Sequence, residues 1–167
     1  SERPGQRLAA IVQYCEDAII SLALDGTVTS WNYGATKLFG YRADEIVGRS
    51  ITQIIPNERH REEDGILAQI SRGDTVKHFE TKRVRKDGTH LDISLTVSPI
   101  KDESDAIIGA SKVARDITQR KRSEDARQKL IECSRLVGTA FFEAVVEAIA
   151  EALDVRWVLL CDLAPSN

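Results

Sequence analysis

Residues 76–100 have the sequence VKHFETKRVRKDGTHLDISLTVSPI, which predicts a β-hairpin. Asp87-Gly88 is a dipeptide typical of tight turns, and β-forming runs flank it on both sides. In the second run apolar and polar residues alternate, so one face of this strand is predicted to be buried and the other exposed to solvent. The apolar positions of that run are Leu91, Ile93, Leu95 and Val97.

A second hairpin and a fifth strand follow from similar signals. Residues 18–24 and 27–31 are two β-rich runs on either side of Asp25-Gly26, again a tight-turn dipeptide. Residues 107–114 form another apolar run after a polar loop. The sequence therefore predicts five strands, four of which pair as two antiparallel hairpins.

Residues 32–72 carry helical signals instead. Short helices are predicted at 35–39, 44–47 and 52–55, and a longer helix extends from about residue 57 to residue 71, before Gly73. One face of the long helix combines apolar and titratable side chains. These are His60, Glu63, Leu67 and Ile70, with Ile66 beside them.

The order of these elements predicts an α+β fold, in which a five-stranded antiparallel sheet carries helices on one face. Because the helices cannot all lie flat on the sheet, we expect a cavity between the long helix and the inner sheet face. Ahead of the sheet, residues 1–16 are predicted to contain an amphipathic helix, since apolar residues recur there at helical spacing. These apolar residues are Leu8, Ile11, Val12 and Cys15.

The C-terminal part of the chain is predicted to be mainly helical. Residues 117–138 are strongly charged and predict a linker helix with only weak heptad spacing. Acidic residues are interspersed with the basic cluster Arg120-Lys121-Arg122, which is typical of a solvated flank rather than a nucleic-acid or membrane surface. An amphipathic helix over 142–153 and a single apolar strand over 155–163 follow, and nothing after this strand can pair with it.

Composition limits the classes of function. The 167 residues carry a formal net charge of -3, which suits one domain with appendages and argues against general nucleic-acid binding. No apolar run approaches the roughly 20 residues of a membrane span. The three cysteines, Cys15, Cys133 and Cys161, are far apart and fit a reducing, cytoplasmic setting. Methionine is absent, so we expect a segment of a longer protein.

Seven short strings occur in order between residues 17 and 118. They are Asp17-Ala18-Ile19, Leu24-Asp25-Gly26, Trp31-Asn32, Leu38-Phe39-Gly40-Tyr41, Glu45-Ile46-Val47-Gly48, Arg85-Lys86-Asp87-Gly88 and Arg115-Asp116-Ile117-Thr118. Together they resemble the PAS domain, a small sensory module of signalling proteins, with its C-terminal PAC motif. Asp116, Ile117 and Thr118 resemble the family's exit from the sheet into a signalling helix. The tail from about residue 139 resembles the first helix and strand of a GAF domain.

The resemblance implies a domain organisation and a set of partners. It implies a PAS sensor domain at residues 17–116, a signalling helix at 117–138 and an incomplete GAF-like start at 139–167. Such modules form dimers through flanking helices and pass a shift to an effector, for example a histidine kinase of a two-component system. Because an incomplete domain cannot bury a core of its own, we also expect the tail to take part in a homodimer.

The resemblance places a ligand pocket between the sheet and the long helix, which can hold heme, flavin, a small metabolite or nothing. The candidate lining residues are Ile20, Leu22, His60, Glu63, Leu67, Ile70, Ile93, Leu95 and Val97. Neither a catalytic set nor metal-ligand spacing occurs, so we expect a binding module rather than an enzyme. Phospho-acceptor and ATP-binding motifs of a kinase are not found in the sequence.

Two cofactors can be tested against the residues. Covalent flavin photochemistry needs a cysteine in the pocket, and none occurs between Cys15 and Cys133, so it is excluded while non-covalent flavin stays open. In a heme-binding member, the resemblance puts the axial ligand at Glu63, which is a poor ligand for ferrous heme. His60 lies one turn earlier and is an alternative ligand, unless it only decorates a charged helix start.

Glu63 itself has two interpretations. If its face of the helix points into the cavity, Glu63 is a buried acid that selects a ligand donor group or senses pH, because burial raises the pKa of a carboxyl. If the helix start turns outward, Glu63 pairs with Arg59 or with solvent, and this is the interpretation we favour. Trp31 and Asn32 are expected to be structural, with Trp31 packed at the sheet edge and Asn32 capping the next helix.

The sequence is compatible with three hypotheses of function. The first is a cytoplasmic PAS sensor that binds a small ligand and signals through its C-terminal helix. The second is a ligand-free dimerisation scaffold with a closed core. The third is a heme-based gas sensor.

Overall fold

The computed structural model describes residues 11–133 and 139–153, which divide into two compact units at residues 117 and 118. The predicted strand over 155–163 lies outside the described residues. Of the predicted helix within residues 1–16, only residues 11–16 are described, and residues 11–13 are helical.

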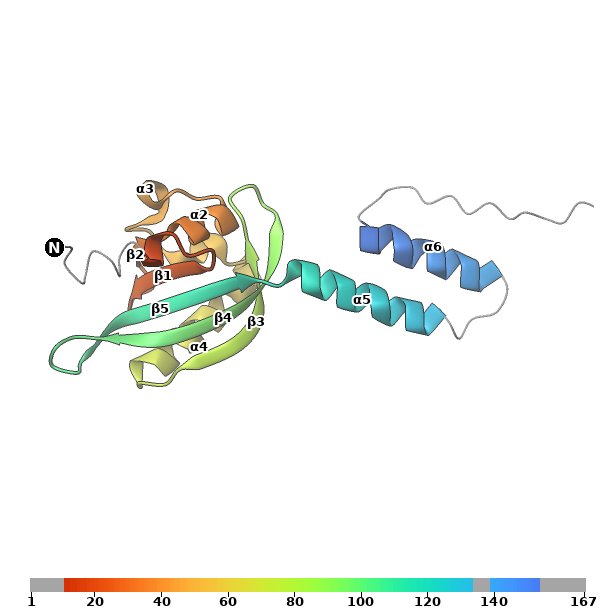
Figure 1. Cartoon of the computed structure of the whole chain (residues 1–167). Coiled ribbons are helices and arrows are strands. Elements are labelled where there is room, and N and C mark those ends of the chain that lie inside the picture. Colours follow the sequence, from red (N-terminus) through yellow and green to blue (C-terminus); the bar gives the residue numbers. More distant parts are fainter. Residues whose placement is uncertain (1–10, 134–138, 154–167) are drawn as a thin grey trace, which may run out of the picture. The chain divides into compact units, whose positions relative to one another are not determined.

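The first unit contains a five-stranded antiparallel sheet (Figure 1). Its strands are β1 (Ala18–Ala23), β2 (Val28–Trp31), β3 (Val76–Val84), β4 (His90–Lys101) and β5 (Ile107–Asp116). The spatial order is β2-β1-β5-β4-β3, so the last strand in sequence lies in the centre of the sheet. The predicted fold class is confirmed.

Both predicted hairpin turns form as their residues require. The side chain of Asp25 accepts a hydrogen bond from the backbone N–H of Thr27 at 2.9 Å, and Asp87 accepts one from Thr89 at 2.9 Å. The glycine after each aspartate has a positive φ, which a residue with a Cβ atom rarely adopts.

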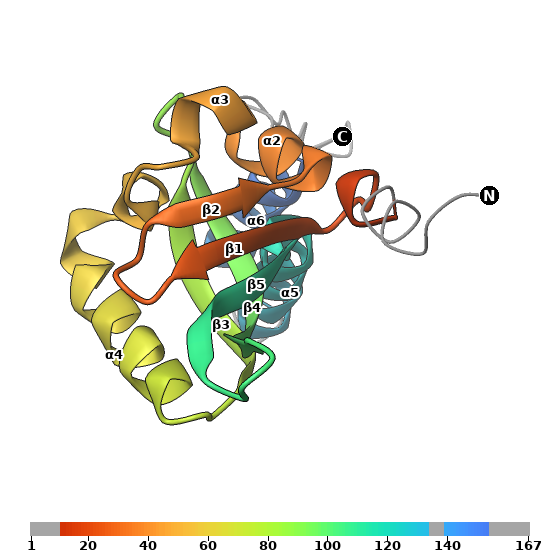
Figure 2. The same cartoon turned by 90° about the vertical axis from the view of Figure 1, so that its left-hand side faces the viewer.

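Helices between β2 and β3 cover the inner face of the sheet. They are α2 (Tyr33–Phe39), α3 (Ala43–Ile46), the 3-10 turns η1 (Ile51–Ile54) and η2 (Asn57–Arg59), and α4 (His60–Ser71). The longest, α4, contacts β3, β4 and β5, while α2 contacts β1 and α3 contacts β2 (Figure 2). The helix predicted from residue 57 begins as a 3-10 turn, a frequent form of a helix N-terminus.

Asn32 and Trp31 have the structural roles predicted for them. Asn32 Oδ1 accepts hydrogen bonds from the backbone N–H groups of Ala35 at 2.8 Å and Ile19 at 2.9 Å, which caps α2 and ties it to β1. Trp31 is buried on the edge strand β2, packs against Phe39 and donates its indole N–H to a backbone carbonyl. This corner of the domain is therefore fixed by side chains that are not available for a ligand.

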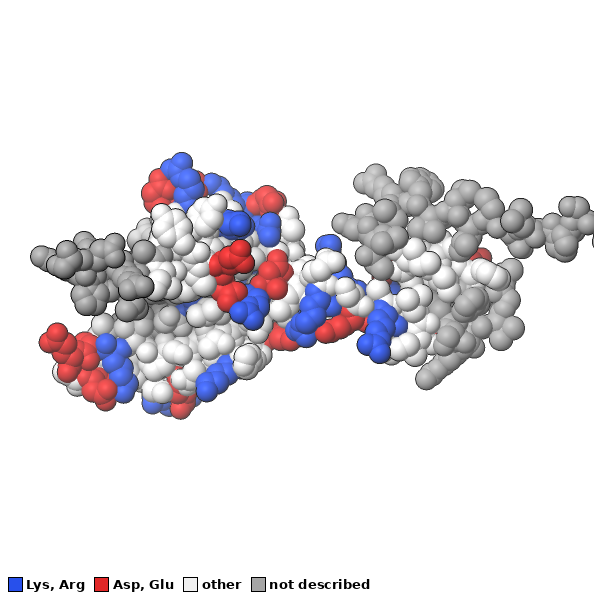
Figure 3. All heavy atoms as spheres, viewed as in Figure 1, with Lys and Arg blue, Asp and Glu red and all other residues white. Residues whose placement is uncertain are grey.

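The second unit contains two helices, α5 (Thr118–Cys133) and α6 (Thr139–Leu153), which pack against each other. Ala126 on α5 and Ala148 on α6 are buried, and Lys129 pairs with Glu151 between the two helices. Acidic and basic side chains are mixed along α5, as its sequence predicts (Figure 3). Neither a PAC motif nor a truncated GAF domain is shown for the chain, and both stay predictions.

Candidate functional site

Six of the nine candidate lining residues belong to one closely packed apolar cluster. They are Ile20, Leu22, Ile70, Ile93, Leu95 and Val97, each at most 2% exposed. Leu67 packs at the margin of this cluster and is half-buried. The side chains predicted to border a cavity are therefore inside the domain, and they contact one another as a core.

Glu63 lies at the inner side of α4 and is only 2% exposed. Its Oε1 atom accepts a hydrogen bond from Nζ of Lys112, which is 3% exposed, in a buried ion pair. Lys112 is in the centre of β5, where its backbone neighbours are Ile20 of β1 and Val97 of β4. The favoured interpretation of Glu63, an outward carboxylate paired with Arg59 or solvent, is wrong.

The pairing with Arg59 belongs to the preceding residue on α4. Glu62 Oε2 lies 3.1 Å from Arg59 Nη1, and Glu62 Oε1 lies 2.9 Å from Nη1 of Arg83 on β3. Thr81 Oγ1 donates to Glu62 at 2.8 Å and accepts from Arg83 Nη1 at 3.1 Å. Two adjacent acids of α4 therefore meet one cation from β3 and another from β5, and we call Glu62, Glu63, Arg83 and Lys112 the buried charge cluster.

The cluster is balanced in charge but incompletely hydrogen bonded. Oε2 of Glu63 and Nη2 of Arg83 are buried, and neither has a hydrogen-bond partner among the described residues. These two atoms face each other at 3.9 Å, an ion-pair separation that is too long for a hydrogen bond. Buried polar groups are normally satisfied, so these two atoms mark a position inside the domain where a polar contact can still form.

Electrostatics within the cluster reflect its burial. Burial lowers the pKa of Lys112 below its usual range, although the Glu63 carboxylate raises it. Burial by itself would raise the pKa of Glu62, but hydrogen bonds from Thr81 and Arg83 outweigh it and hold this pKa below the usual range. Lys112 therefore depends on Glu63 for its charge in the core.

The residues present do not fit a heme. Glu63, at the position of the axial ligand, is engaged with Lys112. His60 is half-buried, and its Nε2 atom lies 3.1 Å from the backbone carbonyl oxygen of Ile55, a hydrogen-bond distance. Both candidate ligand side chains thus already have partners within the protein. Within the described residues, no group of three or more His, Cys, Asp or Glu side chains is placed to hold a metal ion.

The strand-to-helix exit lies beyond Lys112 on the same strand. β5 ends at Asp116, Ile117 is buried and donates its backbone N–H to the carbonyl of Asp92 at 2.9 Å, and α5 begins at Thr118. Ile117 thereby anchors the end of the sheet to β4. Lys112 and Ile117 are joined by the last residues of β5, without a break in the strand.

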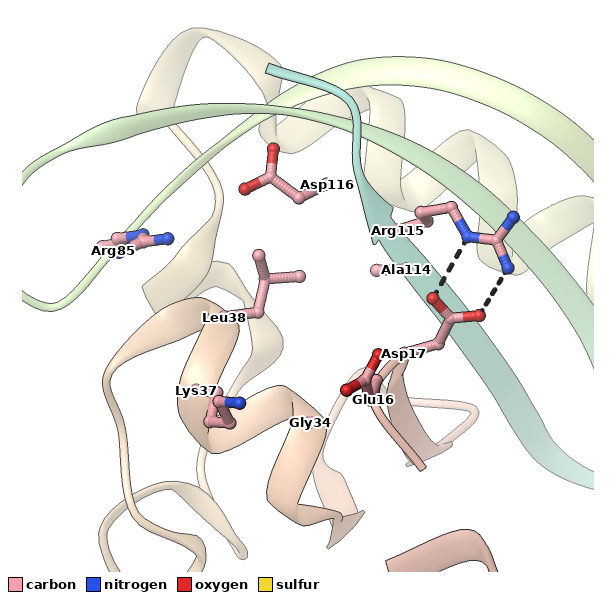
Figure 4. A pocket seen from close by; sticks show the side chains of 9 residues that line it. All are labelled: Glu16, Asp17, Gly34, Lys37, Leu38, Arg85, Ala114, Arg115 and Asp116. Carbon is pink, nitrogen blue, oxygen red and sulfur yellow. Dashed lines mark hydrogen bonds and ion pairs between the residues drawn. The ribbon is translucent and has the colours of Figure 1, made fainter. Parts of the chain in front are cut away.

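A surface hollow of about 400 Å³ lies beside this exit (Figure 4). Its lining residues come from the start of β1, from α2 and from the ends of β3 and β5: Glu16, Asp17, Gly34, Lys37, Leu38, Arg85, Ala114, Arg115 and Asp116. Asp17 accepts two hydrogen bonds from the Arg115 guanidinium, at 2.7 and 3.1 Å, which lowers the pKa of Asp17 and raises that of Arg115. None of the nine predicted lining residues lies in this hollow. Acidic and basic side chains both line it.

Sequence reasoning missed Arg83 and Lys112. A signal for Lys112 is present in the alternation of β5, because Ala110 and Ala114, two positions away on either side, are small and inward-facing. Applied to β3, the same period-2 argument places Arg83 on the face of Thr81. Neither cation was predicted to be part of the site, because a charged residue on a strand is normally assigned to the solvent face.

Comparisons with known proteins agree with this fold. Residues 16–119 match the PAS domain family. Two-component system protein A of Emericella nidulans is 29% identical over 151 residues, and the cell-division control histidine kinase PdhS of Brucella ovis is 26% identical over 129 residues. These alignments cover 90% and 72% of this chain but only 22% and 12% of the two relatives, so the chain spans a small part of their length.

Solved structures show the same fold. The PAS domain of a protein from Colwellia psychrerythraea is 25% identical, with a TM-score of 0.64 over 70% of this chain and 99% of that one. An RNA-binding light-oxygen-voltage receptor, at 19% identity, has a TM-score of 0.67 over 79% of this chain and 38% of its own, a likeness of fold alone. Within the described residues, every helix is too short or too polar to cross a membrane. The match over residues 16–119, on a sheet and helix arrangement of this kind, shows that the chain belongs to the PAS domain family.

Proposed function

We propose that this chain is the sensory part of a larger signalling protein of the histidine-kinase or two-component type. In this proposal, residues 17–116 bind a small polar molecule between α4 and the sheet, and residues 117–138 transmit the response to an effector domain. Support comes from the curated relatives, which are named as a two-component system protein and a histidine kinase. A cytoplasmic location and a GAF-like continuation over 139–167 belong to the same proposal.

The buried charge cluster is the observation that carries the ligand-binding part. A core formed only for stability would gain little from burying charges, because desolvation offsets most of the attraction within a buried ion pair. Here Glu63 and Arg83 each retain one buried atom free to make a hydrogen bond. A small molecule with both donor and acceptor groups would satisfy both atoms, and would need α4 to move away from the sheet to enter.

An extraction experiment tests this function directly. We expect freshly purified protein, or the full-length signalling protein, to release a polar metabolite on denaturation, detected by mass spectrometry, without an absorption band at 300–700 nm. Leu95→Trp should reduce the amount bound, because Leu95 lies at the inner sheet face and a larger ring occupies the adjacent space. Ile108→Trp is the matched control, since Ile108 is 54% exposed on β5 and should leave binding unchanged. If both variants bind equal amounts of the metabolite, the binding site is not next to Leu95.

A dimerisation scaffold is the second candidate, and a specific observation favours it. The predicted lining residues are packed together as a core, which is the arrangement expected of a domain that binds nothing. Large apolar side chains are exposed ahead of β1, at Ile11 and Tyr14, and on α6, at Phe142. Sedimentation of the chain at tens of micromolar distinguishes the outcomes: a dimer that releases no metabolite supports the scaffold, and a monomer contradicts the homodimer in either version.

A further inference from the structure

The buried charge cluster connects α4 to the strand that leaves the sheet. Glu63 is on α4, and its partner Lys112 is on β5, four residues before Asp116 ends that strand. Arg83, the second cation near Glu63, is on β3 at the far edge of the sheet. One carboxylate therefore has two cations within reach, and these cations belong to different strands.

The two contacts of Glu63 are unequal in the present arrangement. Oε1 is hydrogen bonded to Lys112, whereas Oε2 and Arg83 Nη2 are 3.9 Å apart and lack hydrogen-bond partners among the described residues. A shift of about 1 Å would bring that second contact to hydrogen-bond distance. Glu62 already holds Arg83 Nη1 at 2.9 Å, so the guanidinium is oriented for a second acceptor.

We propose that Glu63 is a positioning residue with two arrangements, one paired with Lys112 and one paired with Arg83, and that this exchange couples the position of α4 to the stability of β5. The proposal rests on the proposed function, because a ligand that moves α4 would change which cation Glu63 is paired with. Coupling requires an element with two discrete arrangements that both ends can bias. Glu63 provides this element because it cannot leave both cations without stranding a buried charge.

The surroundings of Lys112 indicate which part of β5 a change of pairing would affect. Lys112 is flanked by Ala110 and Ala114, and the anchor formed by Ile117 lies five residues after Lys112. β5 lies between β1 and β4, so its backbone cannot shift without disturbing hydrogen bonds on both sides. A change of pairing at Lys112 is therefore expected to alter how readily β5 opens, up to its exit at Asp116.

Substitutions on the outer side of α4 can test the coupling without a ligand. A Cβ atom at Gly65 would meet nothing within 4 Å, so Gly65→Ala should strengthen α4 alone. Replacing a compatible glycine by alanine stabilises by about 0.4–1 kcal/mol, which corresponds to amide exchange slower by about two- to fivefold. Ala68→Gly, at an exposed position of the same helix, should produce the opposite change and ensures that α4 is perturbed in both directions.

The measurement is native-state amide hydrogen exchange on the 167-residue chain, using amides of residues 107–116 that open without global unfolding. With Glu63 and Lys112 present, we expect exchange over 107–116 to slow with Gly65→Ala and to accelerate with Ala68→Gly, as it does in α4. In the background Glu63→Met/Lys112→Met, which keeps volume and net charge, the effects in α4 should persist and those over 107–116 should vanish.

The control background is Lys82→Met, which removes an ion pair with Asp92 between β3 and β4 and leaves the cluster intact. Coupling should survive in it. Unchanged coupling in the double Met background, or none with Glu63 and Lys112 present, would overturn the proposal. A ligand-free chain can still pass this test, and a ligand-binding chain can still fail it, so the proposed function and the coupling are judged separately.

Discussion

Removing either partner of the Glu63–Lys112 pair should destabilise the domain, whereas removing both should not, and Glu63→Met should make stability depend on pH. Both side chains are 3% exposed, so removing one partner leaves a charge in the core with little solvent around it. Such single removals cost about 3–5 kcal/mol. Replacing both by Met should be close to neutral or stabilising by about 1–4 kcal/mol, because the desolvation of both charges is avoided.

Release of a proton limits the loss when Lys112 is left without Glu63. At pH 7 this release costs about 4.6 kcal/mol from a reference pKa of about 10.4. Arg83 Nη2 lies 3.9 Å from Glu63 and can partly replace Lys112, so Lys112→Met should be the milder single change.

The sign of the pH effect follows from the burial of Lys112, which lowers its pKa. In Glu63→Met, the pKa of Lys112 in the folded state is below its unfolded value, so stability increases as pH rises from 7 to 9. This slope, relative to wild type, is at most about 1.4 kcal/mol per pH unit.

Urea unfolding monitored by tryptophan fluorescence measures these differences. Trp31 is buried in the first unit, and a Trp157→Phe background makes it the single reporter. Parallel pH profiles for wild type and Glu63→Met, or a double Met variant as unstable as the singles, would refute the assignment of a buried ion pair.

Three further outcomes follow from the described contacts. Asn32→Ala should lower the free energy of unfolding by about 2–4 kcal/mol in urea melts, because several buried hydrogen bonds of this side chain, including the α2 cap, are lost; a loss under 1 kcal/mol would contradict its role. Glu62→Gln should flatten the acid side of the stability profile. The folded-state pKa of Glu62 is below its ordinary value of 4.5, so its contribution is present above that value and is lost as pH falls further; identical acid melting curves would contradict this. Gly34→Ala should lower the melting temperature sharply, since its Cβ would lie 2.4 Å from the Asp17 carbonyl oxygen, whereas Gly65→Ala should raise it; equal shifts in calorimetry would contradict the packing at Gly34.

The sheet could be predicted because its signals are local. The Asp-Gly turns set where strands reverse, and the alternation in 91–97 sets which face is buried. The position of β5 between β1 and β4 is different, since no short-range pattern specifies which strands a lone run pairs with. That placement was not predicted from the sequence, and it is the placement that brings Lys112 under α4.

The site was less predictable than the fold, and Glu63 shows why. Its position on the inner face of the helix was readable from spacing, since Ile66 and Ile70 share that face. Whether an acid there is buried depends on a cation arriving from a strand that begins more than 40 residues later in the sequence. Without that partner, the desolvation of a carboxylate makes the outward orientation the better expectation.

A buried charge in this fold also constrains how the domain can change in evolution and in engineering. Replacing Lys112 alone leaves Glu63 without its partner in the core, and replacing Glu63 alone does the same to Lys112, so either change lowers stability. The two positions should therefore vary together among close relatives, either as a charged pair or as two apolar residues. Relatives with the apolar version would keep the sheet and the helix cover but lose the contact between α4 and β5 that we propose as the coupling. Comparing amide exchange in two such natural versions would separate the stability of this fold from its ability to transmit a change.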